Sequence, residues 1–155
     1  MSLCSEVLEV LKGRTLVTAE SCTGGGIGAA LTSVSGSSAV YKGGIISYTD
    51  WVKRNALGVN GSLLDREGAV SAPVAEAMAV GARQRLTADV AVAVTGLAGP
   101  GGDEYGNPVG TVFVGYSDDH GVISRKYLFL GDREAIRSQT IRAALKMILE
   151  INKKG

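Results

Sequence analysis

Three short apolar runs in this 155-residue sequence each lead into a segment rich in glycine or hydroxyl side chains. The runs cover 15–19, 44–49 and 89–94, and the segments that follow cover 20–28, 48–53 and 95–110. In open α/β sheets, ligands bind at the carboxyl ends of the strands. The pattern therefore predicts a sheet with a loop-built site at one edge, and the 22 glycines of the chain favour loops lined by backbone.

The remaining periodicity predicts helices between these strands. Apolar residues at helical spacing, capping residues and glycine stops predict helices over 2–12, 27–32, 51–57, 63–67 and 73–86, and a long last helix after Asp132. Strands 110–116 and 122–130, which meet near 118–121, are expected to form an antiparallel hairpin. The fold class is therefore α/β, a three-layer α/β/α sandwich with a mixed sheet of about five strands, and residues 1–155 are expected to form one domain.

Charge and composition exclude several classes of function. Sixteen basic and fifteen acidic residues give a net charge of +1, which argues against nucleic-acid binding through phosphate neutralisation. No apolar stretch approaches the roughly twenty residues of a membrane span, and the N-terminus lacks the pattern of a signal peptide. Two cysteines cannot build a disulfide framework, so we expect a cytoplasmic protein without membrane partners.

A candidate nucleophile follows the first strand. Ser21 stands before a helix start, where unpaired N–H groups and the helix dipole favour developing negative charge. We therefore predict an oxyanion site from the backbone of Cys22, Thr23 and Gly24. Ser21 as a simple helix cap is the alternative interpretation. Cys22 is a rival nucleophile by chemistry, although a small buried residue is the simpler interpretation of it.

A serine nucleophile needs a base. The only histidine, His120, falls in the predicted hairpin turn, which makes a Ser-His-Asp triad improbable. A lysine serves instead when burial lowers its pKa, and Lys53 follows the second strand, five residues after Tyr48. Both side chains would then point into one cleft beside Ser21. The alternative is that Lys53 belongs to the solvated face of a short helix.

The third glycine-rich segment is long for an ordinary connection and has the composition of a functional loop. Its N–H groups, including those of Gly96 and Gly99, would cradle a phosphate, and Thr95 would add a hydroxyl. Arg133 and Arg137 at the start of the last helix are candidates to clamp a phosphate, or to pair with neighbouring surface acids. A flexible loop is the alternative interpretation of the segment.

Seven segments together resemble the CinA C-terminal family, in the order in which that family has them. The resemblance covers nearly the whole chain, and its segments are A-E-S-C-T-G-G, G-S-S-A-V-Y-K-G-G, I-S-Y-T-D-W-V-K, G-A-V-S-A-P-V, T-G-L-A-G-P-G-G, P-V-G-T-V and G-D-R-E-A-I-R. Within the family the chain is similar to stand-alone nicotinamide mononucleotide deamidases.

The resemblance implies an amidohydrolase that converts nicotinamide mononucleotide to nicotinic acid mononucleotide and ammonia, a recycling step toward NAD, without a metal or cofactor. It implies Ser21 as acyl nucleophile, Lys53 as general base and Tyr48 as their hydrogen-bonded partner. It also implies that Ser38, Thr95 and Arg137 line the substrate site. Asp50 departs from the asparagine of many relatives, and contact between this carboxylate and Lys53 would weaken the base.

Two other classes of protein remain open. Gly24, Gly26 and Ala29 match G-x-G-x-x-A after a strand, which is a weak signal of a dinucleotide-binding module. A catalytically silent ligand-binding or regulatory domain is the other. Whatever the class of function, the apolar faces of alanine-rich helices suit a homodimer or higher homo-oligomer.

Overall fold

A five-stranded mixed sheet forms the middle layer of the computed structural model, which describes residues 1–153. Its strands are β1 (Leu16–Glu20), β2 (Tyr41–Ile46), β3 (Val90–Gly96), β4 (Thr111–Asp118) and β5 (Gly121–Leu128), in the spatial order β2-β1-β3-β4-β5. β1, β2 and β3 run parallel, whereas β4 and β5 are antiparallel to their neighbours and form the expected hairpin. The predicted fold class is confirmed.

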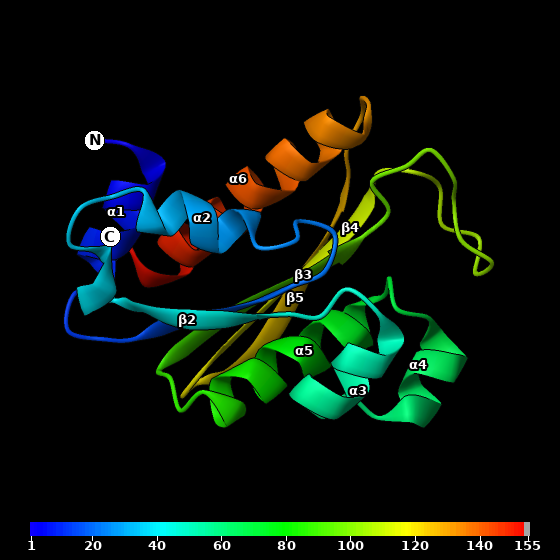
Figure 1. Cartoon of the computed structure of the whole chain (residues 1–155), viewed down its shortest axis with the longest axis horizontal. Helices are drawn as coiled ribbons and strands as arrows, with labels where there is room; N and C mark the ends of the chain where they lie inside the picture. Colours follow the sequence, from blue (N-terminus) through cyan, green and yellow to red (C-terminus); the bar gives the residue numbers. More distant parts are fainter. Residues whose placement is uncertain (154–155) are drawn as a thin grey trace.

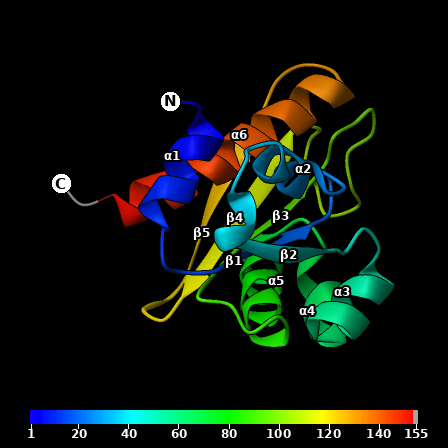
Figure 2. The same ribbon diagram turned by 60° about the vertical axis from the view of Figure 1, so that its left-hand side comes forward.

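Helices cover both faces of this sheet (Figures 1 and 2). One layer holds α1 (Leu3–Val10), α2 (Gly26–Thr32) and α6 (Arg133–Asn152), and the other holds α3 (Asp50–Leu57), α4 (Gly61–Glu67) and α5 (Ala72–Arg85). A short 3₁₀ helix, Ser37–Ala39, precedes β2. Within residues 1–153, no helix combines the length and apolar composition that crossing a membrane requires.

The second strand lies earlier in the chain than predicted. β2 covers Tyr41–Ile46, whereas the prediction was 44–49, so Tyr48 lies in the loop that follows the strand. Gly44 belongs inside the strand because the Thr18 hydroxyl of β1 fills the space that a Cβ would need. Glycine there allows close approach of two strands and does not mark a strand end.

The central strand β3 separates large from small side chains. Val90, Val92 and Val94 pack into the core on the α1, α2 and α6 side, while Ala91 and Ala93 pack against α5. All five are fully buried. Because side chains alternate between the faces of a strand, the A-V alternation in the sequence sets a thick core on one face and a thin one on the other.

The thin core lets α5 approach its neighbours closely. A Cβ at Gly115 of β4 would overlap the carbonyl oxygen of Ala75, and one at Gly81 of α5 would overlap that of Leu57. The small residues of α5 therefore hold α3 close to the sheet, and α3 carries Lys53.

Gly81→Ala is expected to destabilise the protein, although alanine in a helix is ordinarily favoured over glycine by roughly 1 kcal/mol. The added methyl must displace the end of α3, and overpacking of this kind costs about 1–3 kcal/mol. The free energy of unfolding in urea measures the change. Gly61→Ala in α4 is the matched control, because its Cβ would meet only the flexible side chain of Arg54. A stability gain in both variants would contradict the close packing.

Candidate active site

The carboxyl ends of the three parallel strands meet at one edge of the sheet. The last residues of β1 and β2, Glu20 and Ile46, lie side by side in the register. Beyond them the Ser21 N–H donates to the Val94 carbonyl of β3 at 3.1 Å, and the Ser47 N–H donates to the Glu20 carbonyl at 2.8 Å. The residues that follow the strands are thus fixed by sheet-like hydrogen bonds.

Lys53 reaches this edge from α3. Its amine contacts Ser21 Oγ at 3.1 Å and donates to the Ser47 carbonyl at 2.7 Å, with the Tyr48 carbonyl at 3.5 Å. Only 1% of the lysine is exposed. The Thr49 hydroxyl caps the helix by accepting from the Val52 N–H, which fixes the turn that carries Lys53. Ser21 and Lys53 therefore form a buried pair, as the proposed serine–lysine chemistry requires.

Burial lowers the pKa of Lys53, because an ammonium loses its hydration there. Asp50 opposes the shift through its charge, but it is solvent-exposed and forms no ion pair with Lys53 in the described part of the chain. The contact that would have weakened the base is therefore absent from this structure.

The acceptors around Lys53 orient its lone pair. A neutral amine has two N–H donors, and the carbonyl oxygens of Ser47 and Tyr48 can accept both. The lone pair is then left for the hydroxyl of Ser21. This arrangement suits removal of the serine proton.

Cys22, the rival nucleophile, is held in the thiol form. It is 6% exposed, and burial raises its pKa to about 11. A thiol with that pKa has almost no thiolate at neutral pH, and the thiolate is the nucleophile. Ser21 is therefore the nucleophile that the geometry favours.

A cavity of about 330 Å³ opens in front of Ser21 and Lys53. This is near the lower end of the range for small-molecule sites, roughly 300–1,000 Å³. The loop after β3 contributes much of its wall, as expected, including Thr95, Gly96 and Gly99. The other lining residues are Cys22, Tyr48, Asp50, Ala69, Val70, Leu97, Ala98, Gly101 and Arg133.

Tyr48 does not bond to the serine–lysine pair through its side chain. The residue is 59% exposed and lines the cavity, and its hydroxyl accepts from the guanidinium of Arg133 at 3.2 Å. Only its carbonyl faces Lys53. The predicted hydrogen-bonded partnership is corrected accordingly, because the residue lies beyond the end of β2, where its side chain turns outward.

Of the two arginines predicted to clamp a phosphate, Arg133 lines the cavity and Arg137 does not. Arg137 does not line the cavity; it donates to the carbonyls of Cys22 and Thr23, both at 3.0 Å, and so secures the loop that carries Ser21. Arg133, one turn earlier, faces the cavity and donates to the Gly99 carbonyl at 2.6 Å. Arg133 is therefore the cation placed to meet a ligand.

Ser38 is likewise absent from the cavity lining. It is exposed in the 3₁₀ helix that precedes β2, at the opposite end of that strand from Ser21. The sequence resemblance placed it at the substrate site, but a strand of six residues separates the two places within one chain.

The loop after β1 differs from the predicted oxyanion site in two residues, Thr23 and Gly24. The N–H of Gly24 donates to the Ser21 carbonyl at 3.1 Å and is not free for a ligand. Within residues 1–153, the N–H groups of Cys22 and Thr23 have no oxygen acceptor. Cys22 lines the cavity, whereas Thr23 is fully buried outside its lining, so the Cys22 N–H remains as the candidate donor beside Ser21.

Glu20 is a site residue that the sequence reasoning missed. It is 2% exposed, and its carboxylate accepts from Thr23 Oγ1 and from the N–H groups of Ile27 and Gly28. The sequence feature that could have identified Glu20 is an acidic residue at the end of a predicted buried strand, because a buried charge is tolerated only when it has partners.

The same carboxylate argues against the dinucleotide-binding interpretation. A bound pyrophosphate needs the free N–H groups at the N-terminus of the helix after the glycine loop. In α2 the N–H groups of Ile27 and Gly28 already donate to Glu20. The segment that matches G-x-G-x-x-A therefore offers no free anion-binding site at the start of α2.

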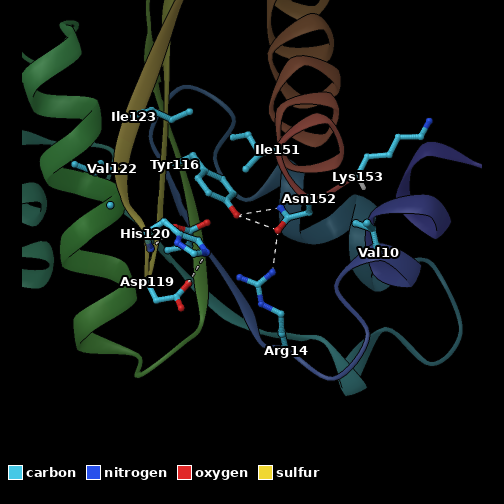
Figure 3. A pocket seen from close by; sticks show the side chains of 12 residues that line it. Val10, Arg14, Tyr116, Asp119, His120, Val122, Ile123, Ile151, Asn152 and Lys153 are labelled. Atoms are coloured by element: carbon cyan, nitrogen blue, oxygen red, sulfur yellow. Dashed lines mark hydrogen bonds and ion pairs between the residues drawn. The ribbon is translucent and has the colours of Figure 1, made fainter. Parts of the chain in front are cut away.

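A larger cavity, about 950 Å³, lies at the other end of the sheet (Figure 3). Asn152 there accepts from Arg14 at 2.9 Å and exchanges hydrogen bonds with Tyr116. His120 lies in the β4–β5 turn with its side chain 88% exposed. This cavity has no serine, cysteine or threonine among its lining residues, so its size does not make it the catalytic site.

Comparison with known proteins agrees with this architecture. The model of the CinA C-terminal domain matches residues 2–151. A CinA-like protein of Synechococcus sp. (strain RCC307) is 49% identical over 151 residues, 95% of this chain and 36% of that protein. One of Mycolicibacterium vanbaalenii is 46% identical over 144 residues, 92% of this chain and 34% of that protein. The chain thus spans about a third of the length of these relatives.

Two solved structures show the same fold over nearly the whole chain. A CinA superfamily protein from Klebsiella pneumoniae 700603 superposes with a TM-score of 0.94 at 36% identity, covering 97% of this chain and 95% of that one. The competence/damage-inducible protein CihA from Agrobacterium tumefaciens gives a TM-score of 0.93 at 42% identity, covering 97% and 94%. The chain belongs to the CinA C-terminal domain family.

Proposed function

We propose that this chain is a serine–lysine amidohydrolase that deamidates nicotinamide mononucleotide to nicotinic acid mononucleotide and ammonia. The contact between Lys53 Nζ and Ser21 Oγ in a buried, ligand-sized cavity carries the proposal. The resemblance to deamidases of this family supplies the substrate. A phosphorylated substrate also agrees with a guanidinium at the cavity mouth.

Acylation follows from the positions of the two side chains. Lys53 takes the proton of Ser21 as Oγ bonds to the carboxamide carbon. The carbonyl oxygen becomes an oxyanion and accepts from the N–H group of Cys22, which lines the cavity. When it collapses, the C–N bond breaks and the Lys53 ammonium gives its proton to the departing nitrogen, which leaves as ammonia.

Deacylation repeats these steps with water. Lys53 takes a proton from water as the water oxygen bonds to the acyl carbon, and the Cys22 N–H holds the second oxyanion. The bond from carbon to Ser21 Oγ then breaks, and Oγ recovers its proton from the lysine. Lys53 ends neutral, and its lowered pKa favours that state.

Arg133 is the candidate phosphate ligand. Its guanidinium has five N–H donors, and within residues 1–153 it donates to the Gly99 carbonyl and the Tyr48 hydroxyl alone. The remaining donors suit a bidentate contact with phosphate. The role that the resemblance gave to Arg137 therefore passes to Arg133 in this proposal.

Ser21→Ala and Lys53→Ala are each expected to reduce ammonia release from nicotinamide mononucleotide by at least about 10³-fold, because the nucleophile and its base act as a unit. Release is measured with purified, folded protein. His120→Ala is the matched control and keeps full activity, because His120 is exposed in a distant turn. A wild-type protein that binds the mononucleotide without hydrolysing it would instead be a silent binding domain.

Arg133→Ala is expected to raise KM for the mononucleotide by roughly 10- to 100-fold, the loss of one charged hydrogen-bond partner. KM for the unphosphorylated riboside should change little, since it has no phosphate to lose. Arg142→Ala, an exposed arginine of the same helix away from this cavity, controls for net charge. An equal rise in KM for both substrates would show that Arg133 does not bind the phosphate.

The acidic limb of the pH profile of kcat/KM should report the pKa of Lys53 in the free enzyme, below its ordinary value of about 10.4. Activity rises with pH as the ammonium loses its proton. Asp50 stabilises that ammonium, so Asp50→Asn lowers the pKa further and moves the limb to lower pH. Asp119→Asn, in the distant β4–β5 turn, is the control. A limb moving to higher pH would contradict this electrostatic assignment.

A further inference from the structure

A buried carboxylate immediately precedes the nucleophile and has no role in the chemistry above. Glu20 is 2% exposed, and no ion pair involves it in the described part of the chain. Three donors satisfy it: Thr23 Oγ1 at 2.6 Å, the Ile27 N–H at 2.8 Å and the Gly28 N–H at 3.0 Å. The positive end of α2 adds to this stabilisation.

These bonds reach across the turn that carries Ser21. An ordinary N-cap comes from the residue just before the helix, whereas Glu20 stands six residues before Gly26. Its carboxylate therefore ties the end of β1 to the start of α2, and the bond to Thr23 fixes the turn between them. The Gly24 N–H closes the same turn on the Ser21 carbonyl.

The backbone of Glu20 holds the other half of the pair. Its carbonyl accepts from the Ser47 N–H at 2.8 Å, and the Ser47 carbonyl accepts from the Lys53 amine at 2.7 Å. Glu20 is thus bonded to the turn that carries Ser21 through its side chain. Through its main chain it is bonded to Ser47, whose carbonyl accepts from Lys53.

We propose that Glu20 is a positioning residue, whose carboxylate holds the Ser21 turn so that the hydroxyl faces Lys53 and the N–H group of Cys22 faces the oxyanion. This inference rests on the proposed function. Glu20 does not line the cavity, and donors occupy both of its oxygens. It therefore acts through the turn and exchanges no proton with substrate.

Positioning differs from charge tuning in its effect on pH dependence. Asp50 is the carboxylate whose charge raises the pKa of Lys53, whereas Glu20 is bonded to Thr23, Ile27 and Gly28 and not to the amine. Removing the carboxylate should therefore lower the plateau of the pH profile without moving its acidic limb.

The test is Glu20→Gln, which keeps the shape but turns one oxygen into an amide that cannot accept an N–H. We expect kcat for nicotinamide mononucleotide to fall about 10²-fold, the effect of a misplacement of about 1 Å. KM should stay within about threefold, because no substrate contact is lost. Glu76→Gln, at a half-buried acid that accepts from Ser124, is the matched control.

Thr23→Val keeps the test decisive if the first variant does not fold. It removes a single donor to Glu20 and should lower kcat in the same way, while Thr23→Ser retains the hydroxyl and restores activity. An unchanged kcat in folded Glu20→Gln, or a shifted acidic limb, would overturn the proposal. A loss of activity in Glu20→Gln no larger than the loss in Glu76→Gln would also overturn the proposal.

A second readout does not depend on the substrate. A fluorophosphonate reacts covalently with activated serines, and its rate at Ser21 should fall in Glu20→Gln and in Thr23→Val. If the wild type reacts at Ser21 but releases no ammonia from the mononucleotide, the substrate proposal fails while the slower labelling still supports Glu20. Equal labelling rates in wild type and both variants would refute the positioning role.

Discussion

The site depends on burying the amine of Lys53 without a carboxylate as its ion-pair partner. A lysine that loses its water and gains an acid partner becomes a permanent ammonium, whereas one held by neutral acceptors can be a base. Lys53 has two main-chain carbonyls and the Ser21 hydroxyl around it, and Asp50 acts only from the exposed rim. The geometry of the sheet edge is what supplies those carbonyls.

That geometry follows from the two unequal halves of the core. Valines on one face of β3 give α6 a thick layer to rest on, while alanines on the other let α5 and α3 lie close. Lys53 extends from α3 to the carboxyl end of the sheet. With larger residues at Ala91 or Ala93, α5 and the helix packed on it would stand farther away, and the contact with Ser21 would lengthen. The packing of the core therefore sets the distance between the Lys53 amine and the Ser21 hydroxyl.

The sequence was sufficient for features that depend on local pattern. The alternation of residues 89–94 identified the central strand, and the glycine-rich segments identified the edge where Ser21, Lys53 and Thr95 come together. What failed depended on side-chain direction. Tyr48 and Arg137 are near the cavity in sequence and in space, but one turns to the surface and the other to the loop backbone. Spacing along a chain does not determine which of two arginines one helical turn apart faces the cavity.

Other failures arose from competition for the same donors. Gly24 and the start of α2 have the N–H groups that an oxyanion or a pyrophosphate would need, and no local pattern reveals that Ser21 and Glu20 already accept them. The buried acid and the buried amine illustrate the same principle. Each is stabilised by neutral groups of its own, the acid by a helix N-terminus and the amine by main-chain carbonyls. If they instead paired with each other, both would stay charged, Lys53 would lose its lone pair, and the helix would lose its cap. Because they are separate, Glu20 caps the start of α2 and Lys53 keeps only neutral acceptors, while burial lowers the pKa of the amine.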